Sequence, residues 1–231
     1  MEQNFKQENP LAAFMRQPKI YIRLPSQGQY WKEGSLEISS TGEYPVYSMT
    51  AKDELLLKIP DALLNGQAVV DVIQNCMPNV KDAWEMPSLD VDAILVAIRM
   101  ATYGNNMTMP VKFGKDLELE YEMDLSKVLD TLLEQISWNT IVPISDEMTV
   151  YVRPLVYRQM TKTAVATFET QKIMQVISSQ EMDDAQKIEI FKDSFRKLTE
   201  MTLGVVTDSV YKIDTSSGST SNKEFIEEFI N

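Results

Sequence analysis

The chain has 231 residues, of which 44% are hydrophobic, and its 34 acidic and 22 basic residues give a net charge of −12. This length allows one large domain or two small ones, with a sizeable core. A strongly acidic surface repels phosphate backbones and anionic lipid headgroups, so we expect neither nucleic acid nor a membrane surface as a partner.

The sequence lacks the side chains on which many hydrolytic and metal sites depend. It contains no histidine and one cysteine, Cys76, which we expect to be a buried apolar residue. A single cysteine excludes an internal disulfide and a cysteine-rich zinc site. Without histidine, Ser-His-Asp and Cys-His mechanisms are excluded as well. We therefore expect no cofactor and no enzymatic activity.

No targeting signal is evident in the sequence. The first residues lack a basic segment followed by an apolar run, and no window approaches about 18 continuous apolar residues. We therefore expect a protein that is made and kept in a cytoplasm.

An arm of residues 1–18 opens the chain. It is polar and contains two prolines, and its one apolar run is residues 11–15. Chain ends of this composition are commonly flexible, so we expect a flexible arm with one short docking turn. The candidate partner contacts in that turn are Leu11, Phe14 and Met15.

Residues 19–49 predict a small antiparallel β meander. Apolar and polar residues alternate in residues 20–24 and 36–38, and 46–49 form a third short strand. Pro-Ser-Gln-Gly at 25–28 and Thr-Gly-Glu at 41–43 are typical turn sequences.

Residues 50–104 predict helices. Thr50 is a candidate N-cap, with Asp53 and Glu54 in the positive first turn that follows. Apolar residues then recur at helical spacing between 69 and 77 and between 91 and 101. Ser88 is the candidate cap of the second of these helices, and Asp90 lies in its first turn.

Residues 105–154 predict a β-hairpin, a helix and two further strands. Apolar and charged residues alternate on both sides of a turn at Gly114-Lys115-Asp116. Apolar residues follow at helical spacing from 125 to 136, which indicates an amphipathic helix. Residues 139–142 and 148–152 are strand-like.

From Leu155 to about Val206 the pattern is helical throughout. Two helices of more than about 20 residues, joined by a short polar loop, predict an antiparallel helical hairpin. Asp183 with Gln186 is a variant of the capping box. The residues that line the second helix are Ile188, Phe191, Phe195, Leu198, Met201 and Val205.

Residues 214–231 predict a flexible linker and a short amphipathic helix. Ser216–Ser221 consists of Ser, Thr and Gly, the composition of a linker. Phe225, Ile226, Phe229 and Ile230 then share one helix face and are candidate partner contacts. Such a helix docks either in a partner's groove or on its own domain, and the sequence leaves both open.

Acidic pairs are the remaining candidates for chemistry. Asp53-Glu54, Asp183-Asp184 and Glu227-Glu228 could bind a hard cation or transfer protons. Each pair lies at a predicted helix start or on an exposed helix face, where an interaction with the helix dipole or with water suffices. A carboxylate-based metal-dependent hydrolase is therefore a minor alternative.

These elements predict an α+β fold with a helical C-terminal half. We expect a flexible arm at 1–18 and a mixed α+β domain at 19–154. A helical hairpin at 155–213 packs on that domain, and 214–231 hold the linker and the docking helix.

Three motifs carry a resemblance to a known family. The first is Pro25-Ser26-Gln27-Gly28, with Tyr30-Trp31 close behind. The second, and the most specific, is Met49-Thr50-Ala51-Lys52-Asp53-Glu54, and the third runs from Asp90 through Arg99 to Tyr103-Gly104. Their order over about residues 19–213 resembles the baseplate hub assembly proteins of contractile-tailed bacteriophages of the T-even type.

The resemblance implies a structural or chaperone-like role in building the baseplate hub. The implied partners are other hub proteins and the tape-measure protein, in the host cytoplasm or in the virion tail baseplate. A permanent virion component is the alternative, and a homo-oligomer stays open. Members of the family often carry a cysteine pair soon after the Tyr-Gly, whereas residues 105–125 hold none. A metal site is therefore not implied here.

Overall fold

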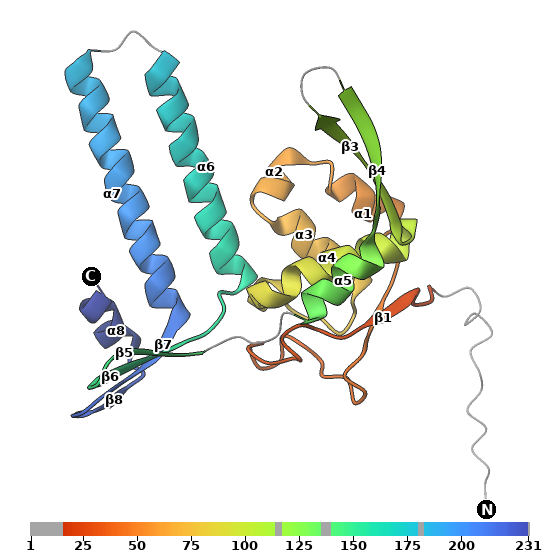
Figure 1. Cartoon of the computed structure of the whole chain (residues 1–231), viewed down its shortest axis with the longest axis horizontal. Helices are drawn as coiled ribbons and strands as arrows, with labels where there is room; N and C mark the ends of the chain where they lie inside the picture. Colours follow the sequence, from red (N-terminus) through yellow and green to blue (C-terminus); the bar gives the residue numbers. More distant parts are fainter. Residues whose placement is uncertain (1–15, 114–116, 135–139, 180–182, 231) are drawn as a thin grey trace, which may run out of the picture.

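The computed structural model describes residues 16–113, 117–134, 140–179 and 183–230. They form two bodies, which we call the N-terminal body (residues 16–134) and the C-terminal body (residues 140–230) (Figure 1). Short helices dominate the N-terminal body, and two long helices stand beside each other in the C-terminal body. The predicted α+β class with a C-terminal helical hairpin is confirmed.

A two-stranded antiparallel sheet begins the N-terminal body. Strand β1 (Ile20–Ile22) pairs with β2 (Tyr44–Val46), so that Ile20 lies opposite Val46. The predicted strand at 36–38 is wrong, since Leu36 forms only an isolated bridge with Val80. The segment between the strands is instead a series of turns, because its backbone bonds go to its own residues and to residues 79–82.

Five helical segments follow this sheet and supply most of the core: α1 (Ala51–Leu56), α2 (Pro60–Leu64), α3 (Gln67–Cys76), the 3-10 turn η2 (Ala83–Glu85) and α4 (Ser88–Tyr103). The predicted apolar stripe of α4 is confirmed, because Val91, Ile94, Ile98 and Ala101 are buried. They pack with residues of the sheet and of α3, including Cys76, which is fully buried as predicted.

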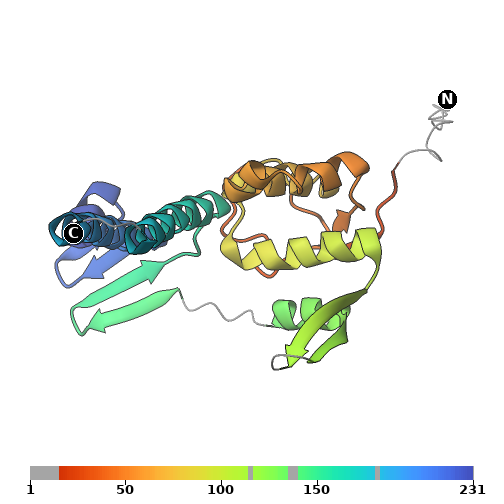
Figure 2. The same cartoon turned by 90° about the horizontal axis from the view of Figure 1, so that it is seen from above.

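The predicted β-hairpin is formed by β3 (Asn106–Phe113) and β4 (Leu117–Asp124), while its turn lies outside the described residues. Helix α5 (Leu125–Glu134) follows and packs on α4 through the buried side chains of Leu125 and Leu129. Figure 2 shows the hairpin and α5 on the side of α4 that faces away from the other helices. They therefore extend the N-terminal body in that direction.

The C-terminal body is a four-stranded antiparallel sheet with the helical hairpin inserted in its middle. The strand order is β5 (Ile141–Ser145), β6 (Met148–Val152), β7 (Val210–Thr215) and β8 (Gly218–Thr220). Helices α6 (Tyr157–Ser179) and α7 (Asp184–Ser209) connect β6 to β7, and α8 (Lys223–Ile230) ends the chain.

Two boundaries differ from those expected. The predicted flexible linker at Ser216–Ser221 is wrong, because these residues form a turn and strand β8, which pairs with β7. The predicted division at 154/155 assigned β5 and β6 to the preceding domain, whereas they pair with β7 beyond the helices. Sequence periodicity identifies strands, but long-range pairing is decided by tertiary structure.

The helical hairpin also differs in detail from its prediction. The side chain of Asp183 makes no capping bond. Ile188, Phe191 and Phe195 were expected to lie inward, yet their side chains are 56%, 54% and 62% exposed. Among the residues of the two helices whose burial the structure describes, the buried ones are instead polar: Thr170, Ser194 and Thr207.

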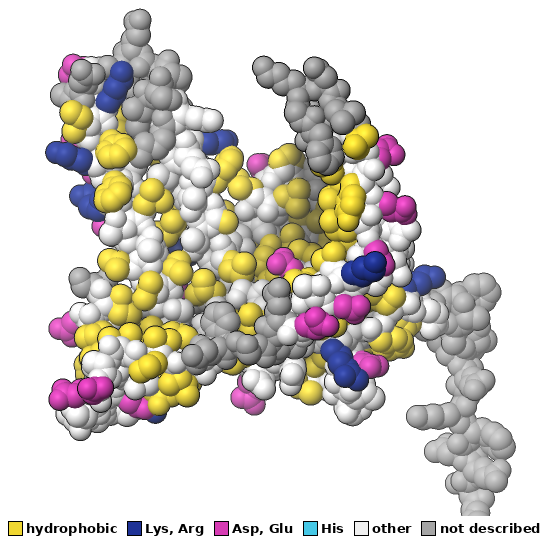
Figure 3. Space-filling view, viewed as in Figure 1, with side chains coloured by type: hydrophobic (Ala, Val, Ile, Leu, Met, Phe, Trp, Pro, Cys, Tyr) yellow, Lys and Arg dark blue, Asp and Glu magenta, His cyan; other side chains and the backbone are white. Residues whose placement is uncertain are grey.

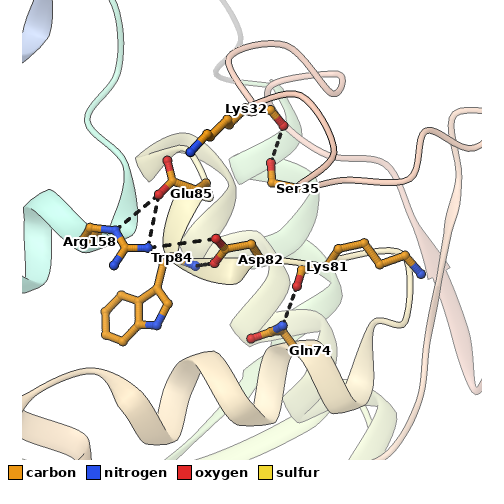
Figure 4. A network of polar contacts seen from close by, with 8 residues as sticks. All are labelled: Lys32, Ser35, Gln74, Lys81, Asp82, Trp84, Glu85 and Arg158. Carbon is orange, nitrogen blue, oxygen red and sulfur yellow. Dashed lines mark hydrogen bonds and ion pairs between the residues drawn. The ribbon is translucent and has the colours of Figure 1, made fainter.

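The two bodies meet at the start of α6. The backbone N–H of Ser88 donates to the carbonyl of Leu155 at 2.8 Å, and the rings of Trp84 and Tyr157 lie 5.8 Å apart. Figure 4 shows Arg158 of α6 reaching Glu85 at 3.2 Å and Asp82 at 4.0 Å. The remainder of the hairpin extends away from this contact (Figure 1).

Gly66 lies close to α6 at this junction, and we expect Gly66→Ala to be destabilising. Its φ is +80°, and an added Cβ would lie 2.9 Å from two side-chain atoms of Thr161. Left-handed strain and overpacking together should lower the free energy of unfolding by about 2–4 kcal/mol, measured by urea denaturation. Gly34→Ala is the matched control, since its φ is +81° with nothing within 4 Å. Equal losses in both variants would contradict the proposed clash.

Candidate functional site

A buried carboxylate, Asp90, joins the first motif to the third. The backbone N–H of Ser26 donates to Oδ1 of Asp90 at 2.7 Å. The Ser26 hydroxyl and Nε1 of Trp31 donate to Oδ2 at 2.5 and 2.8 Å. Asp90 is 0% exposed, so its role is to hold the loop that contains Ser26 and Trp31 against α4.

The loop held by Asp90 has an unusual backbone. Gln27 and Tyr30 have φ values of 54° and 66°, which residues other than glycine rarely adopt. Gly28 also has a positive φ, and an added Cβ would lie 3.2 Å from Cδ1 of Ile38. Each strained residue costs on the order of 1 kcal/mol. The bonds to Asp90 therefore maintain a conformation that the loop would not adopt alone.

A second buried carboxylate, Asp53, lies in the Met-Thr-Ala-Lys-Asp-Glu motif. Thr50 is the N-cap of α1 as predicted, and Thr50 and Asp53 form a reciprocal capping box. The side-chain amide of Asn75, on α3, donates to both oxygens of Asp53 at 2.7 and 2.8 Å. Asp53 is only 2% exposed and therefore joins α1 to α3 rather than meeting solvent.

Arg16, at the end of the N-terminal arm, lies close to this cluster. Its guanidinium donates to the carbonyl oxygens of Asn75, at 3.0 Å, and of Ser48. It also lies 5.4 Å from the centre of the Tyr47 ring. Residue 16 is thus fixed to the N-terminal body, while the predicted contacts Leu11, Phe14 and Met15 lie outside the described residues.

The remaining motif residues connect α1 to α4. The backbone N–H of Met49 donates to the hydroxyl of Thr102 at 2.9 Å. Arg99 lies 4.3 Å from the centre of the Tyr103 ring, and a hydrogen bond to Glu54 raises the pKa of Tyr103. Gly104 ends α4 with a φ of +88°, and Lys52 is exposed. The three motifs therefore meet in one folded unit, and their contacts are structural.

The two buried carboxyl groups have opposite pKa shifts. Burial raises the pKa of Asp53, but donors from Thr50 and Asn75 outweigh burial and lower it overall. Burial also raises the pKa of Asp90, and there the donors from Ser26 and Trp31 only partly offset it. Each donor favours the ionised form, whereas removal from water disfavours it.

Asp53→Asn and Asp90→Asn should therefore change the pH dependence of stability in opposite directions. The lowered pKa of Asp53 adds stability above its unfolded value of 3.8, and this is lost as pH falls through the folded pKa. The raised pKa of Asp90 adds stability below 3.8, and this is lost as pH rises through the folded pKa. The free energy of unfolding is measured by urea titration at successively lower pH. The difference between wild type and Asp53→Asn should become smaller, and the difference between wild type and Asp90→Asn should become larger. Parallel pH profiles would contradict both assignments.

The four residues of helix α8 that were predicted to contact a partner form two pairs, one that packs on the sheet and one that is exposed. Ile226 is 2% exposed and packs with Val210 and Ile213, and Ile230 packs against the same cluster. Phe225 and Phe229 are 59% and 58% exposed. The helix therefore docks on its own sheet through the isoleucines and presents the phenylalanines outward.

The larger surface hollows formed by the described residues lie on the helical hairpin and at its base. One lies between α6 and α7 and measures about 680 Å³, and the other lies at the junction of the two bodies and measures about 540 Å³. The junction hollow contains a single acidic lining residue, Glu85, and the groove between the helices contains none. Within the described residues, no group of three or more His, Cys, Asp or Glu side chains is placed to hold a metal ion.

Comparison with protein families tests the resemblance that the motifs suggested. Residues 18–231 match the model of a family described as T4 bacteriophage base plate protein. The chain belongs to this family. Neither the curated proteins nor the solved structures contained a match. The resemblance drawn from the three motifs is therefore confirmed at the level of a phage baseplate protein.

Membership gives this baseplate protein a structural role in the virion tail baseplate, in contact with other baseplate proteins. No described helix has the length and apolar character needed to cross a membrane. The sequence identified the motif residues but missed that Asp90 is buried. No spacing pattern signals this contact, because Ser26 and Asp90 are 64 residues apart.

Proposed function

We propose that this baseplate protein acts without catalysis in building the baseplate hub, by binding hub and tape-measure proteins through its C-terminal body. The observation that carries the proposal is strand β5. It is one of the two edge strands of the four-stranded sheet, and all five of its residues are exposed. Ile141 and Ile144 are 49% and 61% exposed, which is unusual for strand residues of this type.

The small core of the C-terminal body leaves β5 uncovered. That core consists of Val210, Ile213 and Ile226, with partly buried neighbours on β6 and α8. No described residue of β5 belongs to it. Pro143 removes one N–H donor from this edge, which limits strand-to-strand pairing and favours recognition through side chains. Because both isoleucines are already about half buried, a partner that covered them would gain about 0.8–1.5 kcal/mol from each.

The proposal is tested by co-expressing the chain with individual hub and tape-measure proteins of the same phage and measuring the affinity of each purified complex. Replacing Ile141 and Ile144 with glutamate should weaken binding at least about tenfold, since 1.4 kcal/mol corresponds to a factor of ten. Ile38→Glu is the control, because Ile38 is 65% exposed on the N-terminal body. Equal weakening by the control, or binding to none of these proteins, would refute the proposal.

A hub assembly factor and a permanent component of the baseplate differ in whether the protein remains in the finished virion. Mass spectrometry of purified virions beside isolated assembly intermediates distinguishes them. An assembly factor is enriched in the intermediates and depleted in virions. A permanent component is present at a fixed stoichiometry in both.

A further inference from the structure

The groove between α6 and α7 is lined by two apolar residues, Phe168 and Leu198, and by the polar residues Thr167, Thr170, Gln171, Lys172 and Gln175. Its floor contains Thr170 and Leu198. Phe168 forms the wall on α6, and it is 37% exposed. On α7, Phe191 and Phe195 are more than half exposed, and their rings are stacked with centres 6.5 Å apart. Since successive helix residues are about 100° apart, Phe191 and Phe195 lie on the same side of α7 as Leu198.

The charges around this groove are opposite in sign to those of the whole chain. Lys172 lies with Nζ 4.5 Å from the Phe168 ring, and Lys192 flanks the phenylalanines of α7 at helical spacing. Glu189, Asp193 and Glu200 project from the opposite side of α7, by the same spacing. In Figure 3 the hydrophobic surface over the two helices has dark blue patches along its edges. The phenylalanines beside this groove are therefore flanked by lysines, in a chain of net charge −12.

Helix α8 carries the complementary surface. Phe225 and Phe229 are spaced by four residues, so their exposed rings lie one above the other on the helix. Glu224 and Glu228 lie beside them and form no ion pair with a described residue, whereas Glu227 lies 3.7 Å from Lys223. The outward face of α8 is thus apolar and acidic.

We propose that α8 of one copy binds in the α6–α7 groove of a second copy. Burial of Ile226 holds α8 on its own sheet at the base of the hairpin, whereas the groove is lined by residues further along α6 and α7, so the contact forms between molecules. Groove-to-groove pairing would instead bring the same lysines together, which disfavours it. A head-to-tail contact joins two different surfaces, so copies associate into a ring or an open chain. This self-association is separate from hub binding at β5.

Two double variants test the contact by complementation. The groove variant carries Phe191→Glu and Phe195→Glu, and the α8 variant carries Phe225→Glu and Phe229→Glu. Sedimentation analysis should show wild-type species of two or more copies, while each variant alone is monomeric. An equimolar mixture should contain 1:1 dimers, because each variant keeps one intact half of the interface. Circular dichroism and thermal unfolding confirm that both variants remain folded.

Other outcomes overturn the proposal. A monomeric wild type at the highest soluble concentration refutes self-association. If the α8 variant alone still dimerises and the groove variant does not, the groove pairs with itself. If the mixture stays monomeric, α8 and the groove are not partners.

Lys192→Glu should weaken association at least tenfold by charge repulsion, and Glu228→Lys on the other molecule should restore part of it. Ile38→Glu, on the N-terminal body, should leave association unchanged.

Discussion

Asp90→Ala is expected to lower the free energy of unfolding by about 3–5 kcal/mol, the largest effect of any single polar substitution in the N-terminal body. The substitution removes the acceptor of three hydrogen bonds, two from Ser26 and one from Trp31. Each buried donor left without an acceptor costs about 1–3 kcal/mol. The loop that contains Gln27 and Tyr30 also loses the contact that maintains its positive φ values.

Urea denaturation of wild type and variant measures this loss. Asp92→Ala is the matched control, because Asp92 lies two residues further along the same helix and is exposed. It should change stability by about 0.5 kcal/mol or less. Limited proteolysis supplies a second readout, since cleavage between residues 25 and 31 should be faster in Asp90→Ala. A loss no larger than that of the control would show that Asp90 does not hold the loop.

Asp53→Ala is expected to lower the free energy of unfolding by about 2–4 kcal/mol. About 1–2 kcal/mol of this is the lost capping box at the start of α1. The remainder arises because the amide of Asn75 loses both acceptor oxygens in a partly buried position. The loss of stability is larger than for an ordinary acidic residue in the first turn of a helix, because Asp53 connects two helices.

The control for Asp53 is Asp61→Ala. Asp61 lies in the first turn of α2 and is exposed, so only its interaction with the helix dipole, about 0.3–1 kcal/mol, is lost. Asn75→Ala should reproduce part of the loss of Asp53→Ala. The double variant should lose less than the sum of the two, because both substitutions remove the same hydrogen bonds. Strict additivity would indicate that the two side chains act independently.

These two carboxyl groups give the acidic residues of the family motifs a structural role. Asp90 accepts hydrogen bonds from a turn that is far away in sequence. Asp53 accepts hydrogen bonds from the side chain of Asn75, which lies on another helix. The motif residues thus maintain the N-terminal body. The partner surfaces that we propose lie in the C-terminal body, on β5, on α8 and along the helical hairpin, where large apolar side chains are exposed.

The sequence by itself determined the elements that depend on local periodicity and local bonds. The cap at Thr50, the stop at Gly104, the β3–β4 hairpin and the two long helices follow from residues close together in the chain. Composition alone also excluded a disulfide and histidine-dependent chemistry. The order of three motifs was sufficient to indicate a phage baseplate family, which the family match then confirmed.

Only the tertiary structure decided which side chains are buried. Asp90 and Asp53 have the sequence signature of exposed first-turn acids, but distant donors from Ser26 and Asn75 allow both to be buried. Phe191 and Phe195 have the signature of a core stripe, but the hairpin has no third helix to cover them. Burial depends on which elements pack together, and periodicity marks an apolar face without specifying what covers it.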